Sequence, residues 1–259
     1  MYPVFKLGFF VINAYTFFMI CGFWIAFVYA MLILKSVKIK FLSENDPFYI
    51  LICLLFSSIF GAKAAFLIAE RPDIFFANPL SLFKIWESGF IYYGGIIGAS
   101  LCIILYSKIR RIPIKFLCDT FAPTLPINVF FIRTGCLFAG CCYGRETLLP
   151  WGMKSGTDIL RHPTQIYEMI GAAVLFLFLH FYNKKHFGEG KILPLYFIGY
   201  AAIRFIVEFF RGDERGGYFL SMSVSQNISI LAFAAALITI YAINKKNAGQ
   251  SKRQNLPPL

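Results

Sequence analysis

The sequence has few charged residues. Only 15% of its 259 residues are Asp, Glu, Lys or Arg, whereas a soluble domain has about 25%. So few charges cannot cover a surface that faces water, and they also exclude a disordered chain. The length and the long apolar runs exclude a small disulfide scaffold. The 58% of hydrophobic residues and the mean hydropathy of +0.67 instead predict a polytopic integral membrane protein.

Histidine is also scarce, with three residues against seven cysteines. Cys136, Cys141 and Cys142 lie in one short segment. Metal sites typically combine C-x2–4-C pairs with further His or Cys. A C-x4-C-C run fits that pattern poorly, so we expect no metal ion and no other cofactor. In an oxidising compartment Cys136 could form a disulfide with Cys141 or Cys142, which leaves a membrane thiol oxidoreductase as an alternative function.

Seven apolar stretches approach the roughly 20 residues that a helix needs to cross a hydrocarbon core of about 30 Å. Glycines interrupt the third stretch and prolines the fourth, and broken helices at membrane depth are tolerated only against protein or a water-filled cavity. The sequence therefore predicts an all-α integral membrane protein with seven transmembrane helices. They are expected at residues 8–34, 48–69, 89–107, 116–132, 164–183, 192–210 and 222–243.

The basic residues predict the orientation of these helices. Lys and Arg cluster after the first, third, fifth and seventh stretches, and loops rich in these residues stay in the cytoplasm. Seven spans then place the N-terminus outside and the C-terminus in the cytoplasm. The first span lacks a small-residue cleavage site, so we expect it to be retained. We expect one transmembrane domain over residues 1–246 and a disordered cytoplasmic tail over residues 247–259.

Several arginines lie where this orientation rule does not expect them. Arg133 ends the fourth span, Arg204 and Glu208 lie one helical turn apart in the sixth, and Arg211 follows the sixth. An ionisable residue within a span is costly and usually functional. A structural Arg204–Glu208 pair or snorkelling of Arg133 and Arg211 to lipid head groups would be simpler explanations. Guanidinium groups match phosphate oxygens and stay charged in a low dielectric, so the arrangement favours a phosphate site.

Two helix starts carry further candidate residues. Tyr93 precedes Gly94, Gly95 and Gly98, where the glycines allow either a bound ligand or another helix to approach closely. Tyr93 could equally belong to an interfacial aromatic belt. The fifth span begins with the run from His162 to Glu168, and its Pro and Thr are typical of a helix N-terminus. The His, Gln and Glu of that run exceed what helix capping requires.

These segments, in this order, resemble the prolipoprotein diacylglyceryl transferase family. The most specific are the runs His-Pro-Thr-Gln-Ile-Tyr-Glu at residues 162–168 and Arg-Phe-Ile-Val-Glu-Phe-Phe-Arg at residues 204–211. The resemblance implies a seven-span protein of the bacterial cytoplasmic (inner) membrane with its active site towards the outer leaflet. It implies transfer of diacylglyceryl from phosphatidylglycerol to the thiol of a lipobox cysteine in a prolipoprotein, with release of glycerol phosphate. Membrane lipids are then its surroundings, and we expect no nucleic-acid partner.

The resemblance also assigns candidate roles to individual residues. Arg133 is similar to the arginine that binds phosphatidylglycerol and Arg211 to a second essential arginine, and Tyr93 occupies a catalytic position. Arg204 and Glu208 are expected to orient these groups. The full set expected to bind substrate comprises Tyr15, Gly94, Gly95, Gly98, Tyr143, Gly144, Arg145, His162, Gln165, Arg204 and Glu208.

The chain departs from the family pattern at positions that would face the acceptor. Tyr93 stands where the family usually has a His, and Cys136 and Cys141 stand where it has Asn and Glu. Tyrosine has a reference pKa near 10, against about 6.5 for histidine, so Tyr93 is a poorer base at neutral pH. The arginines are retained, which favours the same lipid donor. A different acceptor remains open, and so does a lipid-binding or transport protein without chemistry.

Overall fold

The apolar stretches form helices because a helix satisfies its backbone hydrogen bonds internally, as a lipid environment requires. The computed structural model describes residues 4–7, 10–36, 45–84, 89–154, 158–212, 218–219 and 222–254. Within them the helices are α1 (Ala14–Ser36), α2 (Asp46–Glu70), α3 (Pro72–Ala77), η1 (Pro79–Phe83), α4 (Tyr92–Ile109), α5 (Ile114–Phe121), α6 (Thr124–Ala139), α7 (Thr164–His186), α8 (Ile192–Glu208) and α9 (Val224–Gln254).

Short strands lie between or before some of the helices. In the part of the chain that the structure describes they form three antiparallel two-stranded sheets, each made of strands that are neighbours in the sequence. The pairs are β1 (Val4–Leu7) with β2 (Phe10–Asn13), β3 (Met153–Lys154) with β4 (Leu160–Arg161), and β5 (Tyr218–Phe219) with β6 (Met222–Ser223). The fold is thus helical, and the hairpins of the described residues lie before the first helix or between helices.

Five helices in the described part of the chain are long and apolar enough to cross a membrane. They are Ala14–Ser36, Asp46–Glu70, Ile114–Ala139, Thr164–His186 and Val224–Asn247. Gly94–Ile109 is a shorter apolar helix, and α8 has 17 residues. A multi-pass helical membrane protein is therefore confirmed. Six of the seven expected spans each overlap one helix, and the fourth overlaps α5 and α6. Seven crossings and the orientation of the termini stay predictions.

Two differences from the sequence expectations concern boundaries. The fourth expected span is divided into α5 and α6 at Ala122 and Pro123, because proline has no N–H to continue the helical ladder. The last helix continues to Gln254, into the segment that we expected to be a disordered tail. Residues 255–259 of that tail lie outside the described residues.

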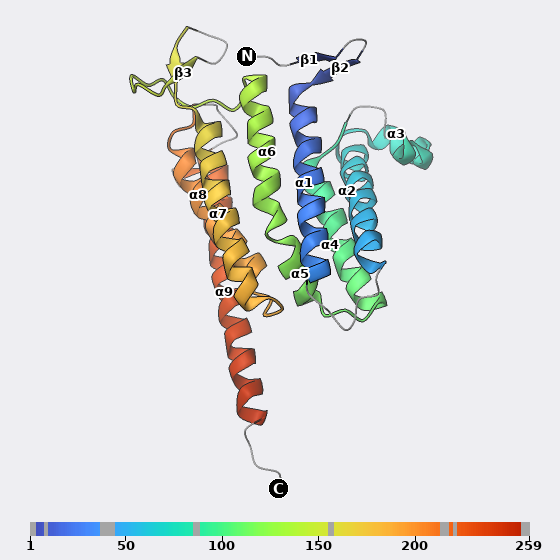
Figure 1. Ribbon diagram of the computed structural model, residues 1–259. Coiled ribbons are helices and arrows are strands. Elements are labelled where there is room, and N and C mark those ends of the chain that lie inside the picture. Colours follow the sequence, from blue (N-terminus) through green and yellow to red (C-terminus); the bar gives the residue numbers. More distant parts are fainter. Residues whose placement is uncertain are drawn as a thin grey trace. The chain divides into compact units, whose positions relative to one another are not determined.

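The chain divides into two compact units, Met31–Leu117 and the remainder, Met1–Ala30 with Cys118–Leu259. In the first of these, α2 packs along α4 (Figure 1). A Cβ on Gly98 would collide with the backbone of Ser57, and one on Gly94 with the backbone of Gly61. Helix packing therefore accounts for these two glycines, which the sequence left open between packing and ligand approach.

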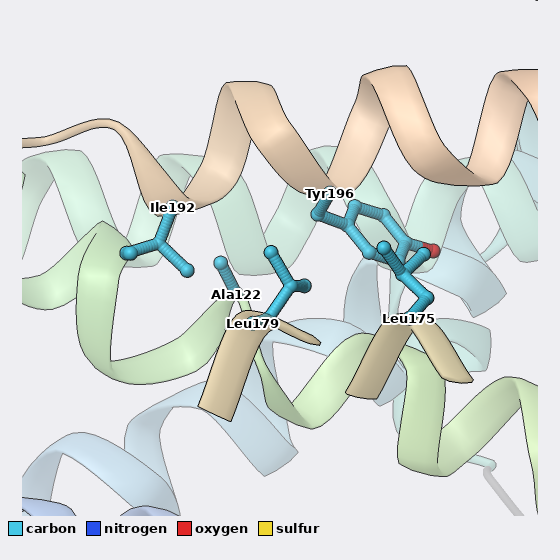
Figure 2. Packing of buried hydrophobic residues seen from close by; sticks show 5 residues of the cluster. All are labelled: Ala122, Leu175, Leu179, Ile192 and Tyr196. Carbon is cyan, nitrogen blue, oxygen red and sulfur yellow. The ribbon is translucent and has the colours of Figure 1, made fainter. Parts of the chain in front are cut away.

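In the other unit, α7 packs between α6 and α8, and α8 packs on α9 (Figure 1). Its apolar core joins Ala122, before α6, to Leu175 and Leu179 of α7 and to Ile192 and Tyr196 of α8. The five side chains converge in Figure 2. Between helices in lipid, such close van der Waals packing rather than the hydrophobic effect stabilises the association, and it fixes α7 against its neighbours.

A buried carboxylate ties the start of α8 to α5. Asp119 is fully buried and accepts hydrogen bonds from the backbone N–H groups of Gly188 at 2.9 Å, Gly190 at 2.8 Å and Ile192 at 3.1 Å. Both glycines have positive φ, 85° and 79°, a conformation that glycine adopts without a steric penalty. The Asp119 carboxylate thus determines the path of the connection between α7 and α8.

Replacing Asp119 by Ala should strongly destabilise the protein. Three amide groups would lose their acceptor, and a buried donor without a partner costs about 1–3 kcal/mol. We expect a loss of about 3 kcal/mol, which lowers the melting temperature by roughly 6–12 °C in a chain of this size. The measurement is thermal unfolding of the purified protein in detergent. The control is D73A, which removes only an exposed ion pair with Arg71, and an equal effect of the two variants would contradict the assignment.

Candidate active site

The site is built around Glu168, in the second turn of α7. Pro163 precedes the helix, where a missing N–H costs nothing. The helix repeat then brings Thr164 and Glu168, four residues apart, to one face. Both are buried, and Glu168 is only 1% exposed. A carboxylate in such surroundings remains ionised only if cations and hydrogen-bond donors replace its water.

Three arginines from separate parts of the chain supply those cations. Arg133 of α6 donates its Nε–H to Oε2 of Glu168 at 2.7 Å. Arg204 of α8 donates from Nη1 to Oε1 at 2.6 Å, and Arg211, after α8, donates from Nη1 to the same oxygen at 3.4 Å. One carboxylate therefore holds together three groups of like charge, which would otherwise repel one another.

A second carboxylate continues the network from α8 to the start of α9. Arg204 donates from Nη2 to Glu208 at 3.1 Å and to the hydroxyl of Ser225 at 2.7 Å. Ser223 donates to the other oxygen of Glu208 at 2.9 Å. The expected Arg204–Glu208 pair is thus present, but it is part of a larger cluster. Among the three arginines and two glutamates, cations exceed carboxylates by one.

Cys136, Cys141 and Cys142 lie beside this cluster, where α6 ends. Gly140 has a φ of 73° and ends the helix in the left-handed conformation, and Cys142 has a φ of 61°. Cys136 is buried and Cys141 is exposed. The three sulfur atoms lie within 4.8 Å of one another, and Nη1 of Arg133 lies 4.0 Å from Cys136 Sγ.

Side chains from the start of α7 hold the backbone of this cysteine segment. Gln165 donates from Nε2 to the carbonyl of Cys141 at 2.6 Å, and Thr164 donates from its hydroxyl to the carbonyl of Cys142 at 2.7 Å. Burial and the neighbouring Cys142 raise the pKa of the Cys141 thiol. The structure contains thiols rather than disulfides at all seven cysteines, each of which lies within the described residues.

Residues 144–146, after the cysteines, lie between residues 161–162 and residues 210–211 and form backbone hydrogen bonds with both. These hydrogen bonds are called the ladder below. Gly144 donates its N–H to the carbonyl of His162 at 2.9 Å, and His162 donates to the carbonyl of Arg145 at 2.9 Å. Arg145 donates its backbone N–H to the carbonyl of Phe210 at 2.8 Å and its Nε–H to the carbonyl of Arg211 at 2.9 Å. This ladder positions the backbone from which the Arg211 side chain reaches Glu168.

Aromatic and imidazole groups surround the same ladder. His162 Nδ1 lies 3.1 Å from the hydroxyl of Tyr167, which also accepts a hydrogen bond from Trp151. The Arg161 guanidinium lies 4.8 Å from the centre of the Tyr143 ring. His162 therefore has a positioning contact in this structure, and Tyr143 packs against a cation.

The structure brings together most of the residues that the sequence singled out. Arg133, Arg204, Arg211 and Glu208 share one cluster, and Tyr15 packs against Gly135, two residues from Arg133. Gly144, Arg145, His162 and Gln165 hold the backbone around that cluster. Gly94, Gly95 and Gly98 belong to the other unit, and the side chain of Tyr93 lies outside the described residues. The functional role of these four residues stays a prediction.

Sequence reasoning missed the residue at the centre. Glu168 was noted only as part of a helix start, although an acid one turn inside an apolar span is itself a sign of a buried ionic site. Tyr200 was also missed. It is partly buried in α8 and hydrogen-bonded to Arg133, but a tyrosine in an apolar helix gives no signal that would separate it from the core. Ser223 and Ser225 likewise have no distinguishing pattern.

A multi-pass helical membrane protein with three guanidinium groups around one buried carboxylate is suited to binding an anion beside the bilayer. The family assignment agrees with this class. The chain matches the sequence model of the family named prolipoprotein diacylglyceryl transferase over residues 3–242. It belongs to that family, which confirms the resemblance noted from the motifs.

Individual relatives support the assignment across most of the chain. Phosphatidylglycerol--prolipoprotein diacylglyceryl transferase 2 of Clostridium perfringens (strain 13 / Type A) is 37% identical over 221 residues, covering 83% of this chain and 85% of the relative. Phosphatidylglycerol--prolipoprotein diacylglyceryl transferase of Clostridium tetani (strain Massachusetts / E88) is 35% identical, covering 81% and 84%. The protein of the same name from Wolbachia sp. subsp. Brugia malayi (strain TRS) is 31% identical, covering 80% and 82%.

Replacing Glu168 by Gln should destabilise the whole unit. The neutral amide cannot compensate three arginines, and its NH2 group would face a guanidinium instead of accepting from it. Breaking a buried ion pair by removing one partner costs about 3–5 kcal/mol. Thermal unfolding in detergent measures the effect. The matched control is E146Q, because Glu146 is 65% exposed and its ion pair with Arg161 is long, at 3.5 Å. Equal melting temperatures for the two variants would show that Glu168 is not the centre of the cluster.

Replacing Gly144 by Ala should disrupt the ladder. A Cβ there would lie 2.5 Å from the carbonyl oxygen of Phe210 and 2.7 Å from that of His162, and backbone atoms cannot move aside as a side chain can. Overpacking of this kind costs about 1–3 kcal/mol. G95A is the comparison, since its nearest contact would be 3.3 Å. A melting temperature that falls in G144A but hardly in G95A is the expected result, and the reverse order would contradict it.

Proposed function

We propose that this chain is a phosphatidylglycerol-dependent diacylglyceryl transferase. It moves the diacylglyceryl group to the thiol of a lipobox cysteine in a prolipoprotein and releases glycerol phosphate. The observation that carries the proposal is the convergence of Arg133, Arg204 and Arg211 on one buried carboxylate in a member of this family. The names of the relatives state the donor and the acceptor.

The arginines suit the leaving group of this reaction. As the bond between the glyceryl carbon and the phosphate oxygen breaks, negative charge gathers on the phosphate. Donors that are already oriented stabilise that charge without rearrangement, and most effectively where water is excluded. Arg133 and Arg211 hold the phosphate in this proposal, while Arg204 and Glu208 keep them in position through Glu168.

The remaining predicted residues complete the proposed cavity. Tyr15, Tyr143, Gly144, Arg145, His162 and Gln165 line it or support its backbone, and the substrate-binding role of Gly94, Gly95 and Gly98 rests on the family resemblance alone. Tyr93 is retained as a catalytic residue in place of the family's usual His. The acceptor thiol must become a thiolate to attack, and a tyrosine is a weak base for that purpose at neutral pH.

The proposal includes the placement of the protein in the membrane. The chain forms one domain of seven transmembrane helices over residues 1–246, in the bacterial cytoplasmic membrane, with the N-terminus outside and the C-terminus in the cytoplasm. The arginine cluster then faces the outer leaflet. The basic residues that follow the first, third, fifth and seventh helices support this orientation, because loops rich in Lys and Arg stay in the cytoplasm.

Replacing Arg133 or Arg211 by Ala should lower the rate of diacylglyceryl transfer at least about 100-fold, the usual cost of losing one oriented donor at a developing oxyanion. R133K keeps the charge without the planar fork, so an intermediate rate is expected. The assay combines the purified protein, labelled phosphatidylglycerol and a lipobox peptide, with mass spectrometry of the products. Membrane fractionation checks that each variant is still inserted.

The control for this series is R71A, because Arg71 is exposed and its ion pair is with exposed Asp73. Full activity of an inserted R133A variant would overturn the phosphate-binding role. The same assay tests the acceptor. Release of glycerol phosphate without lipidation of the peptide would keep the donor and replace the acceptor, while no release at all would favour a lipid-binding or transport protein.

A further inference from the structure

The cysteine cluster has a geometry that the sequence spacing did not predict. A C-x4-C-C run is not a usual metal motif, and for that reason we expected no metal ion. In the folded chain, however, Cys136, Cys141 and Cys142 bring their three sulfur atoms within 4.8 Å of one another. Cys136 is the last buried residue of α6, and the left-handed turn after it folds the other two cysteines back over the helix end.

This spacing is close to what a tetrahedral ion requires. Zinc–sulfur bonds are about 2.3 Å long, so two sulfur ligands of one tetrahedral zinc ion lie about 3.8 Å apart. The sulfur–sulfur separations, all within 4.8 Å, therefore exceed this value by about 1 Å at most. The cysteine backbone need not move, because Gln165 and Thr164 already hold the carbonyls of Cys141 and Cys142.

The cluster supplies three ligands, which leaves one position of a tetrahedral ion without a cysteine ligand. Within the described residues, the group that could bind one ion contains only these three cysteines. Cys136 is buried, whereas Cys141 is exposed, so the cluster extends from the protein interior to the surface. Structural zinc sites are closed by four protein ligands, whereas catalytic zinc sites have three and leave one position open.

Charge also favours an ion at this place. Three thiolates and one Zn²⁺ carry a net charge of −1, and the guanidinium of Arg133 lies 4.0 Å from Cys136 Sγ. The same arginine contacts Glu168, so the sulfur cluster and the proposed phosphate site share a residue. A thiol bound at the fourth position would therefore lie near the phosphate of the bound lipid, to which the diacylglyceryl carbon is attached.

We propose that Cys136, Cys141 and Cys142 bind one zinc ion whose fourth position receives the thiol of the acceptor. This rests on the proposed function. Coordination makes a thiol release its proton, here to water, because the metal stabilises the thiolate. The sulfur then attacks the terminal glyceryl carbon, a carbon–sulfur bond forms, and the carbon–oxygen bond to phosphate breaks. Glycerol phosphate leaves with the electron pair, and the neutral thioether binds zinc more weakly than the thiolate did.

Metal binding is tested first, without any activity measurement. The full-length protein is purified in detergent under reducing, oxygen-free conditions and loaded with Zn²⁺ or Co²⁺. We expect one ion per chain and the intense near-ultraviolet and visible absorption of tetrahedral thiolate-bound cobalt. C136S, C141S and C142S should each weaken binding at least 10-fold, and the triple variant should lose it. C21S and C53S, which change cysteines outside the cluster, should bind as the unchanged protein does.

Thermal unfolding of each metal-free variant checks that it is folded, so a loss of binding is not a loss of structure. Addition of a lipobox peptide should shift the visible cobalt bands and add a fourth sulfur ligand by X-ray absorption, whereas the same peptide with Ser in place of Cys should do neither. Stoichiometric binding by the triple variant would overturn the proposal. A stable disulfide within the cluster that prevents metal binding would also overturn it. So would an ion with four ligands from the protein, whose spectrum does not change when the peptide is added.

The transfer assay separates this inference from the proposed function. If chelation of zinc abolishes lipidation and added zinc restores it, both stand. If the metal-free protein transfers at the full rate, the zinc inference is wrong and the transferase remains. If zinc and the peptide bind as described but phosphatidylglycerol releases no glycerol phosphate, the ion site stands and the transferase proposal is wrong.

Discussion

The buried carboxylate of Glu168 holds three guanidinium groups that would otherwise repel one another. Its partners come from the second half of α6, the C-terminal part of α8 and the segment after α8. Tyr200 and Glu208 support them. Removing charges from water is costly, and they are stable in such a place only as a mutually compensated group. The packing of α6, α7 and α8 therefore creates the site and in turn depends on its charges.

The rest of the site is arranged by backbone hydrogen bonds rather than by side-chain charge. Thr164 and Gln165 at the start of α7 hold the cysteine segment, and Gly144 allows the following residues to pass between His162 and Arg211. Several residues that look like ligands in the sequence thus have a positioning role. A rigid scaffold of this kind keeps donors oriented before a substrate arrives, which is the condition for effective electrostatic catalysis.

Much of the fold and part of the site could be predicted from local pattern. The expected spans are helical, the fourth as two helices, because a helix satisfies the backbone hydrogen bonds of a long apolar run internally. Arg133, Arg204, Glu208 and Arg211 were also found, because a charge in or beside an apolar span is conspicuous. Glu168 was underestimated, since its neighbours at the helix start offered a sufficient local explanation, and Tyr200 resembled any core tyrosine.

The sequence by itself determined the helical membrane class, the positions of the helices and the family, because these depend on composition and on short motifs that are contiguous in the chain. Only the tertiary structure decided which charges meet and which sulfur atoms cluster. Arg133 and Arg211, which are 78 positions apart, contact the same carboxylate of Glu168. Such contacts form only when the helices pack together. The spacing of three cysteines along the chain excluded a usual metal motif, whereas the turn at Gly140 brought their side chains together.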